Sequence, residues 1–318
     1  MERNIALDLL KLSMAFMVVG LHAGFLGEFT SLGQYLTVNG VFRIAVPVFL
    51  LINGFYFHHI LKNSGQLNWL KRVLILYAVW MIFYSYFWFS VPDISLVGLI
   101  KFTKDIIIGY HHLWYISGMF GAAIILIILR GCSSFTLATT ALLSFLVGVL
   151  IQYIGNYHYF EGSVVDKLFN MHWFHRNMFF FSYPFFCIGY LIHKHSVHEK
   201  ITLRNAGIMS ALGMLALFGE SYVNYHQNGR DGGFDNFLSL LFVCPFVFLL
   251  FMKFNIQGSS KNISLLSSAI YFIHSFFLSV LRKFFDLEAT LLTLAAILLS
   301  IIASYAIIKI NNRLKFIL

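Results

Sequence analysis

Charged residues are scarce in this chain: Asp, Glu, Lys and Arg make up 11% of its 318 residues, whereas 59% are hydrophobic. A typical soluble domain carries about 25% charged residues. Phenylalanine alone fills 36 positions. A water-soluble fold of this length could not bury so much apolar surface, because the exposed surface of a folded chain grows too fast with its size. The shortage of charge therefore excludes an ordinary soluble domain and indicates a protein embedded in a lipid bilayer.

Cysteine is also rare, with Cys132, Cys187 and Cys244 as the three examples. They share no metal-like spacing and two lie in apolar runs, so we interpret them as helix-packing residues rather than ligands, a disulfide or a nucleophile. The formal net charge of +9 comes without a dense Lys/Arg tract or a nucleic-acid motif. Basic loops facing anionic lipid explain that charge, and we expect no nucleic-acid partner.

Long apolar runs separated by short polar breaks fill the sequence, and each helix that crosses a bilayer needs roughly 20 such residues. We therefore predict an all-α polytopic membrane helix bundle with about ten transmembrane helices in a single domain, residues 1–318. The predicted spans are 5–26, 35–57, 70–90, 112–130, 135–154, 177–193, 204–224, 235–252, 264–282 and 289–309.

The stretch 91–111 differs from these runs because Lys101, Lys104 and Asp105 interrupt its apolar residues. An interfacial amphipathic helix or a re-entrant segment fits it better than a full span. Loops on the N-terminal side of the predicted membrane hold more Lys and Arg than the opposite loops. Both termini are therefore expected to be cytoplasmic. Lys11 interrupts the first apolar run and no convincing cleavage site follows, so we expect an uncleaved first span.

The first predicted span contains three titratable residues: Asp8, Lys11 and His22. At 100° per residue, Lys11 and His22 are about 20° from perfect alignment, and Asp8 is a neighbour of Lys11 at i,i+3. The rise from Lys11 to His22 is about 16 Å. Ionisable groups at such depths cost at least about 2.5 kcal/mol and usually face a wet cavity. A polar channel is favoured over the alternative, a structural ion pair plus an interfacial histidine.

Other polar residues stand at similarly costly positions. Arg43 lies where it could either extend to the interface or bind an anionic group in a cavity, and Asn53 adds an amide deeper in the second span. His112, with His111 beside it, is predicted at the membrane depth of His22, and two imidazoles at one depth could divide the roles of general base and general acid.

Further candidates for a cavity that holds an acceptor come from four other segments. Their aromatic and polar side chains are equally compatible with membrane-interface belts, helix packing or a solvated loop. The candidates are Trp114 in the fourth span, Glu220 near the outer end of the seventh, Tyr271 and His274 in the ninth, and the outer loop 155–176, which includes Trp173 and Arg176. We expect no bound metal, because the histidine runs on the cytoplasmic side lack a carboxylate–histidine spacing.

Four segments, spread in order over most of the chain, together resemble the integral membrane acyltransferase family 3, which includes bacterial polysaccharide O-acetyltransferases. Each segment alone is weak and the set is fairly specific. The segments are Asp8-x-x-Lys11 with Lys11-x(10)-His22, Val46 to Phe55, His112-Leu113-Trp114-Tyr115, and Ser264 to His274. Asn53 stands where the family usually has serine, and Lys11 where arginine is commoner. The resemblance is to single-domain members.

The resemblance implies a cytoplasmic acyl-CoA donor, most often acetyl-CoA, and a glycan acceptor such as O-antigen, capsule or another lipid-linked sugar, at the bacterial cytoplasmic (inner) membrane. Lys11, Lys71 and Arg72 are then expected to attract the phosphates of CoA. His22 would act on the acceptor hydroxyl or the oxyanion, His112 would supply the complementary role, and Asp8 would hold Lys11. No cofactor beyond the donor substrate is expected.

Two other functions fit parts of the same pattern. A transporter or flippase for a lipid-linked sugar would use the polar stripe as a substrate path. The chain lacks the internal repeats that mark many transporters, and its histidines gather at one depth. A non-catalytic scaffold would have no need of the ionisable residues in the first span.

Overall fold

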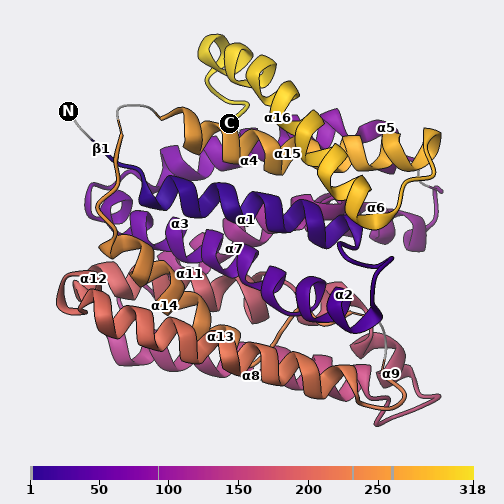
Figure 1. Ribbon diagram of the computed structural model, residues 1–318, viewed down its shortest axis with the longest axis horizontal. Helices are drawn as coiled ribbons and strands as arrows, with labels where there is room; N and C mark the ends of the chain where they lie inside the picture. Colours follow the sequence, from indigo (N-terminus) through magenta and orange to yellow (C-terminus); the bar gives the residue numbers. More distant parts are fainter. Residues whose placement is uncertain (1–2, 92, 231–232, 259–260) are drawn as a thin grey trace.

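The computed structural model describes residues 3–91, 93–230, 233–258 and 261–318 and is a bundle of helices (Figure 1). The described residues contain one pair of strands, β1 (Arg3–Asn4) and β2 (Gln257–Gly258), each of two residues. The two strands run antiparallel and tie the start of the chain to the segment before α15. The prediction of an all-α architecture is confirmed.

A helix occupies each of the ten predicted runs. These helices are α1 (Ala6–Ala23), α3 (Ala45–Lys62), α4 (Gln66–Phe83), α7 (Trp114–Leu129), α8 (Ser134–Asn156), α11 (Tyr183–Lys194), α13 (Leu203–Tyr225), α14 (Leu240–Lys253), α15 (Asn262–Phe284) and α16 (Ala289–Leu314). Shorter elements connect them: α2 (Ser31–Val38), η1 (Val41–Ile44), α5 (Ser85–Trp88), α6 (Leu96–Ile108), η2 (His111–Leu113), α9 (Val164–Phe169), α10 (His172–His175), η3 (Met178–Ser182) and α12 (Val197–Lys200).

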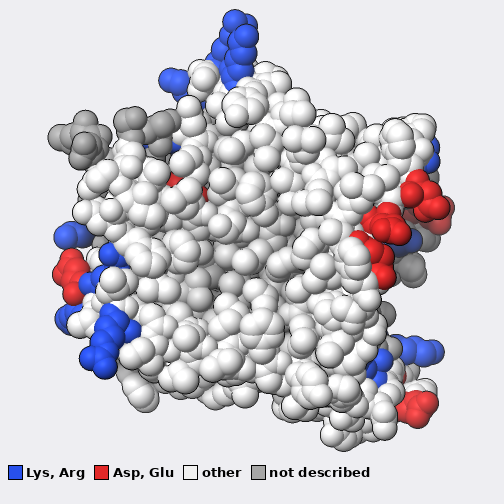
Figure 2. Space-filling view, in the orientation of Figure 1, with Lys and Arg blue, Asp and Glu red and all other residues white. Residues whose placement is uncertain are grey.

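Among the described residues, seven helical stretches are long and apolar enough to cross a membrane. The stretch formed by α2, η1 and α3 counts as one of them. Helices α11 and α14 have only 12 and 14 residues, which is short for a span of about 20 residues. The predicted total of about ten crossings and the cytoplasmic termini therefore stay predictions. Figure 2 shows charged side chains along two opposite edges and at the projecting end of α16, with a broad uncharged band between them, as expected for a bundle that spans a bilayer.

Helix α6 covers most of the stretch 91–111, which was predicted not to be a full span. The helix has 13 residues, none of them buried. Ile100 and Ile107 are exposed by 59% and 61%. Its length is too small for a crossing, and its apolar side chains lie on the outside of the bundle. The expectation of a helix that is not a full span is confirmed.

Helix α1 runs through the middle of the bundle, with α15 on one side and α3 on the other (Figure 1). Helix α3 in turn approaches α11 backbone to backbone. A Cβ atom on Gly54 would lie 1.9 Å from the carbonyl oxygen of Phe186, and one on Gly189 would lie 2.1 Å from that of Leu51. Small residues permit such close helix packing in membranes. The contact fixes α3, and with it Asn53, beside α1.

Candidate active site

Two separate cavities flank α1. The first has a volume of about 190 Å³ and contains Lys11 on α1, Asn53 and Tyr56 on α3, and Ser267 and Tyr271 on α15. The amide of Asn53 donates to the carbonyl oxygen of Phe49 at 2.8 Å and to the hydroxyl of Tyr115 at 2.9 Å. We call this space the Lys11 cavity; its lining of hydroxyls, an amide and one ammonium group suits a polar, partly anionic ligand.

Asp8 and Lys11 form the predicted pair at one end of this cavity. The ammonium nitrogen of Lys11 lies 3.8 Å from a carboxylate oxygen of Asp8, which is buried. Helix α4 borders the same cavity through Leu76. Arg72 is one turn before Leu76, and its guanidinium donates to the backbone oxygen of Leu318, another residue of the cavity lining, at 3.2 Å. Lys71 is exposed beside Arg72. Arg72 thus stands at the edge of the Lys11 cavity.

Aromatic side chains close the other end of the Lys11 cavity. The ring of Tyr271 packs at 5.9 Å from Phe49 and at 5.4 Å from Tyr115. Its hydroxyl donates to the backbone carbonyl of His112 at 2.6 Å. Between Lys11 and His22, Ala15 and Val18 on the expected stripe are 0% and 3% exposed. The polar stripe is therefore not a continuous channel in this structure, because packed side chains separate its two ends.

Beyond Tyr271, four imidazoles from three parts of the chain converge. The ring of His22 lies 4.4 Å from that of His111 and 5.4 Å from that of His274, and His112 lies 4.9 Å from His274. We call these four residues the histidine cluster. His112 and His274 are buried, His22 is half-buried and His111 is exposed. The cluster thus leads from the protein interior to its surface.

The hydroxyl of Ser275 joins three members of the histidine cluster. It lies 2.8 Å from Nδ1 of His112, 3.2 Å from Nδ1 of His111 and 3.3 Å from Nε2 of His274. Nδ1 of His274 lies 2.6 Å from the carbonyl oxygen of Tyr271 and donates to it, so Nε2 of that ring is available to Ser275 when the imidazole is neutral. A hydroxyl can accept one proton and donate another, so Ser275 can relay protons between these rings.

A bend in the backbone directs two adjacent histidines into the cluster. Gly109 has φ of 91° and His111 has φ of 48°, which is the left-handed region that side chains other than glycine occupy at a cost. A Cβ at Gly109 would lie 3.0 Å from the hydroxyl of Tyr77 and 3.1 Å from the backbone of Leu113. Strained backbone of this kind clusters at functional sites. Here it allows both rings to reach Ser275.

The second cavity lies on the other side of His22 and has a volume of about 40 Å³. Arg43, Trp114, Arg176 and Asp235 line it together with His22. Both guanidiniums pair with the carboxylate of Asp235; Arg176 reaches each of its oxygens at 3.0 Å. The guanidinium of Arg176 also lies 4.6 Å from the ring of Trp114, a cation–π distance. We call this space the His22 cavity.

The backbone around Asp235 is held by α8. The side-chain oxygen of Gln152 accepts from the amides of Asp235 and Asn236 at 2.8 and 3.0 Å. Burial alone would raise the pKa of Asp235, but Arg176 and Arg43 outweigh it and hold that pKa well below its usual value. Asp235 is therefore ionised at neutral pH.

Asp235, His172 and His175 could offer ligand atoms within 4.8 Å of one another. Burial lowers the pKa of His175 to about 4, so its imidazole is neutral and able to coordinate. However, both oxygens of Asp235 already accept from Arg176, and Arg43 pairs with the same carboxylate. Two adjacent guanidiniums repel a cation. We therefore interpret this group as an ion-pair centre.

The structure brings most of the sequence candidates to one of these two cavities or to the cluster. Glu220 is an exception, since its carboxylate accepts from the hydroxyl of Tyr153 and from the backbone amides of Leu238 and Ser239. Those amides precede α14, so Glu220 anchors the start of that helix and is not among the residues that line either cavity. The sequence did not identify Ser275 or Asp235 as candidates, and it indicated Arg176 only as one residue of the outer loop 155–176.

Buried ionisable groups in membranes are costly and mark functional sites. A cluster of titratable side chains enclosed by apolar helices therefore fits a membrane enzyme better than a purely structural bundle. The family Acyl_transf_3, described as an acyltransferase domain, matches residues 4–309. The chain belongs to this family, and the resemblance inferred from its motifs is confirmed.

Curated relatives share only part of their length with this chain. A serine/alanine racemase of Enterococcus gallinarum is 24% identical over 304 residues, which cover 86% of this chain and 41% of the racemase. An amino-acid racemase of Enterococcus faecalis is 25% identical over 296 residues, with the same coverage. The chain thus spans about two fifths of the length of these relatives, and their racemase names are not extended to it. No solved structure matches.

Proposed function

We propose that the protein transfers an acyl group, most often acetyl, from acyl-CoA to a hydroxyl of a cell-surface polysaccharide or lipid-linked glycan at the bacterial cytoplasmic membrane. The observation that carries the proposal is the convergence of His22, His111, His112 and His274 at one end of α1, with the Lys11 cavity at the other end. Membership of the acyltransferase family supports the class of reaction.

In this reaction the acceptor oxygen attacks the thioester carbonyl carbon of acyl-CoA, the carbon–sulfur bond breaks, and the acceptor's proton ends on the departing thiol. His22 is the member of the cluster that lines the His22 cavity, so it acts as the base on the acceptor hydroxyl. His112 is buried behind Ser275. It acts through that hydroxyl, returning the proton toward the thiolate rather than touching the acceptor.

The donor is assigned to the Lys11 cavity. Lys11, Lys71 and Arg72 provide positive charge for the phosphates of CoA, and Asp8 positions Lys11. Tyr271 and Phe49 stand between the donor and the histidine cluster. The thioester can reach His22 only if these rings move, so we assign Tyr271 the role of a gate.

The test is transfer of radiolabelled acetyl from acetyl-CoA to glycan in membranes that contain the wild-type protein, the His22→Ala variant or the Lys11→Ala variant. Wild-type membranes should label glycan. At a donor concentration below the wild-type KM, His22→Ala should lose the label and Lys11→Ala should label about tenfold less, and both should keep normal thermal stability. His195→Ala, which changes an exposed histidine on a loop, is the matched control. Full transfer by both site variants would rule out the mechanism. Transport of a lipid-linked sugar without any label in the product would favour the flippase alternative.

A further inference from the structure

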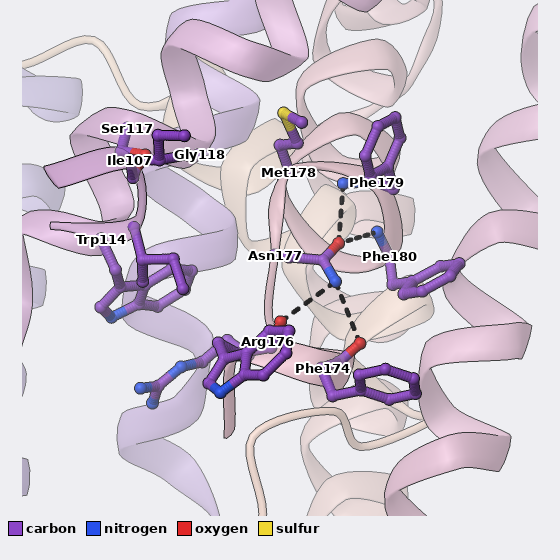
Figure 3. Close-up of a pocket in the computed structure, with 12 residues that line it drawn as sticks. Ile107, Trp114, Ser117, Gly118, Phe174, Arg176, Asn177, Met178, Phe179 and Phe180 are labelled. Carbon is purple, nitrogen blue, oxygen red and sulfur yellow. Dashed lines mark hydrogen bonds between the residues drawn. The ribbon is translucent and has the colours of Figure 1, made fainter. Parts of the chain in front are cut away.

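An open apolar groove lies next to the His22 cavity, with a volume of about 290 Å³ (Figure 3). Trp114, Ser117 and Gly118 of α7 form one wall, and residues 173–180 form the other. Ile107 and Ile108 of α6 also line the groove, and Figure 3 shows Ile107 beside Ser117 and Gly118. These two isoleucines and Trp173 also line a shallower hollow of about 460 Å³ that follows α6 along Leu99 and Ile100. An apolar path thus leads from the outer surface of the bundle to the site.

Arg176 stands where the groove meets the His22 cavity, because it lines both. Figure 3 shows its guanidinium directed toward Trp114 from the opposite wall. The neighbouring Asn177 holds that wall in place: its side chain accepts from the amides of Phe179 and Phe180 and donates to the carbonyls of Trp173 and Phe174. The position of Arg176 is therefore built into the fold rather than left to a free loop.

The charges at this junction do not balance among the described residues. Arg43 and Arg176 carry two positive charges, and within the described ranges Asp235 is the one carboxylate with which either of them pairs. The Arg43 and Arg176 side chains are only 11% and 23% exposed. Buried unit charges are stable when an opposite charge is near. An anionic group that entered the His22 cavity would supply it, and guanidinium groups bind phosphate through paired hydrogen bonds.

We infer that the groove binds the hydrocarbon chain of a phosphorylated lipid and that Arg176 binds its phosphate. The chain would enter from the bilayer along α6, where exposed apolar side chains face the lipid. The phosphate would stop at the Arg176–Trp114 junction, and the head group beyond it would present a hydroxyl to His22. The hydroxyl's acylation rests on the proposed function, whereas the binding of the lipid does not.

The inference is tested by photo-crosslinking the purified full chain in detergent with an isoprenyl phosphate that carries a diazirine in its chain. The matching isoprenyl alcohol, which lacks the phosphate, is the second probe. We expect the phosphate probe to label α6 or residues 173–180, and to label them about tenfold more than the alcohol, since one charge-assisted contact contributes about 1.5 kcal/mol or more.

Two variants with matched controls separate the head-group contact from the chain contact. Arg176→Gln should reduce labelling by the phosphate probe to the level of the alcohol, whereas Arg204→Gln, which removes an exposed charge on α13, should not. Ile107→Trp should reduce labelling by both probes because it fills the groove. Leu298→Trp, at a residue of α16 that is 60% exposed, should leave both unchanged. Thermal melting of each variant checks that it is folded.

Equal labelling by the two probes, or labelling that survives Arg176→Gln, would overturn the inference. Two competition results would also overturn it. If millimolar inorganic phosphate competes but unlabelled isoprenyl phosphate does not, the site binds phosphate without a lipid. If long-chain acyl-CoA competes but unlabelled isoprenyl phosphate does not, the groove belongs to the donor's acyl chain. The His22→Ala variant should label normally. If it also transfers acetyl normally, the proposed function fails while the lipid site stands.

Discussion

The two cavities beside α1 differ in size, chemistry and access. The Lys11 cavity is about 190 Å³ and presents hydroxyls, an amide and one ammonium group. The His22 cavity is about 40 Å³, and two arginines, a carboxylate and an imidazole line it. The larger space suits the binding of an extended molecule, whereas the smaller one holds groups that move protons and stabilise charge. Under the proposed function, donor binding and chemistry are divided between the two ends of one helix.

The largest effect is expected from His22→Ala, which removes the imidazole facing the His22 cavity. Loss of a general base lowers a rate by about 10²–10⁴-fold. The rate of acetyl transfer should fall by that factor, while the affinity for acetyl-CoA measured by calorimetry should stay at the wild-type value, because His22 does not line the Lys11 cavity. A loss of donor affinity in His22→Ala would mean that the two cavities do not have separate roles.

Lys11→Ala should give the opposite pattern. Removing a charge-assisted contact of about 1.5 kcal/mol raises the KM for acetyl-CoA about tenfold or more, and kcat should change much less. Steady-state kinetics at varied donor concentration measures both quantities, with Lys200→Ala as the exposed control. A fall in kcat with an unchanged KM would place Lys11 in the chemical step instead.

Ser275→Ala should have a smaller effect on the chemical step. The substitution removes hydrogen bonds to three rings of the histidine cluster, and one such bond contributes up to about 1.5 kcal/mol, or about tenfold in rate. We expect kcat to fall about tenfold with an unchanged KM, and Ser275→Thr, which keeps the hydroxyl, to recover part of it. Equal losses in both variants would indicate a packing role, since threonine restores the relay but not the shape.

The last effect concerns the stability of the fold near the His22 cavity rather than the rate of transfer. The pKa of His175 is lowered by burial from 6.5 to about 4, so between these values the unfolded chain binds a proton that the folded chain does not. Stability should therefore fall as the pH drops from 6.5 toward 4, by at most about 3 kcal/mol. A His175→Asn variant keeps the charged and titratable neighbours of His175: Asp235, which stays ionised through this range, Arg176 and His172.

Melting temperatures of wild-type protein and of His175→Asn between pH 7 and pH 4.5 measure this effect. The variant should show a shallower decline than the wild type, and His195→Asn should decline as the wild type does. A variant as steep as the wild type would mean that the acid sensitivity comes from another group.

Hydropathy was enough to predict the helices, because each apolar run of suitable length has no other stable form in a bilayer. It misplaced the start of α14, which was predicted at residue 235 but begins at Leu240. Residues 233–237, which precede it, have no regular secondary structure, and Gln152 accepts from the amides of two of them. No local pattern reveals a partner 83 residues away along the chain.

The candidate site was only partly predictable for a similar reason. His22, His112 and His274 stood out because histidine is costly within an apolar run. Arg176 and Asp235 lie near the ends of such runs, where charges are ordinary, so their sequence context did not distinguish them from solvated loop residues. Periodicity predicted one stripe for Lys11 and His22, but it could not reveal that Phe49 and Tyr271, from other helices, close the space between them.

The proposal that donor binding and chemistry occur at opposite ends of α1 is tested most directly by acetyl transfer in sealed membrane vesicles whose orientation is known. Labelled acetyl-CoA is supplied either inside or outside, and the label in glycan is measured in each case. We expect transfer only when the donor is on the face where Lys11, Lys71 and Arg72 lie. Equal transfer from both faces, or transfer only from the face of the histidine cluster, would contradict the account.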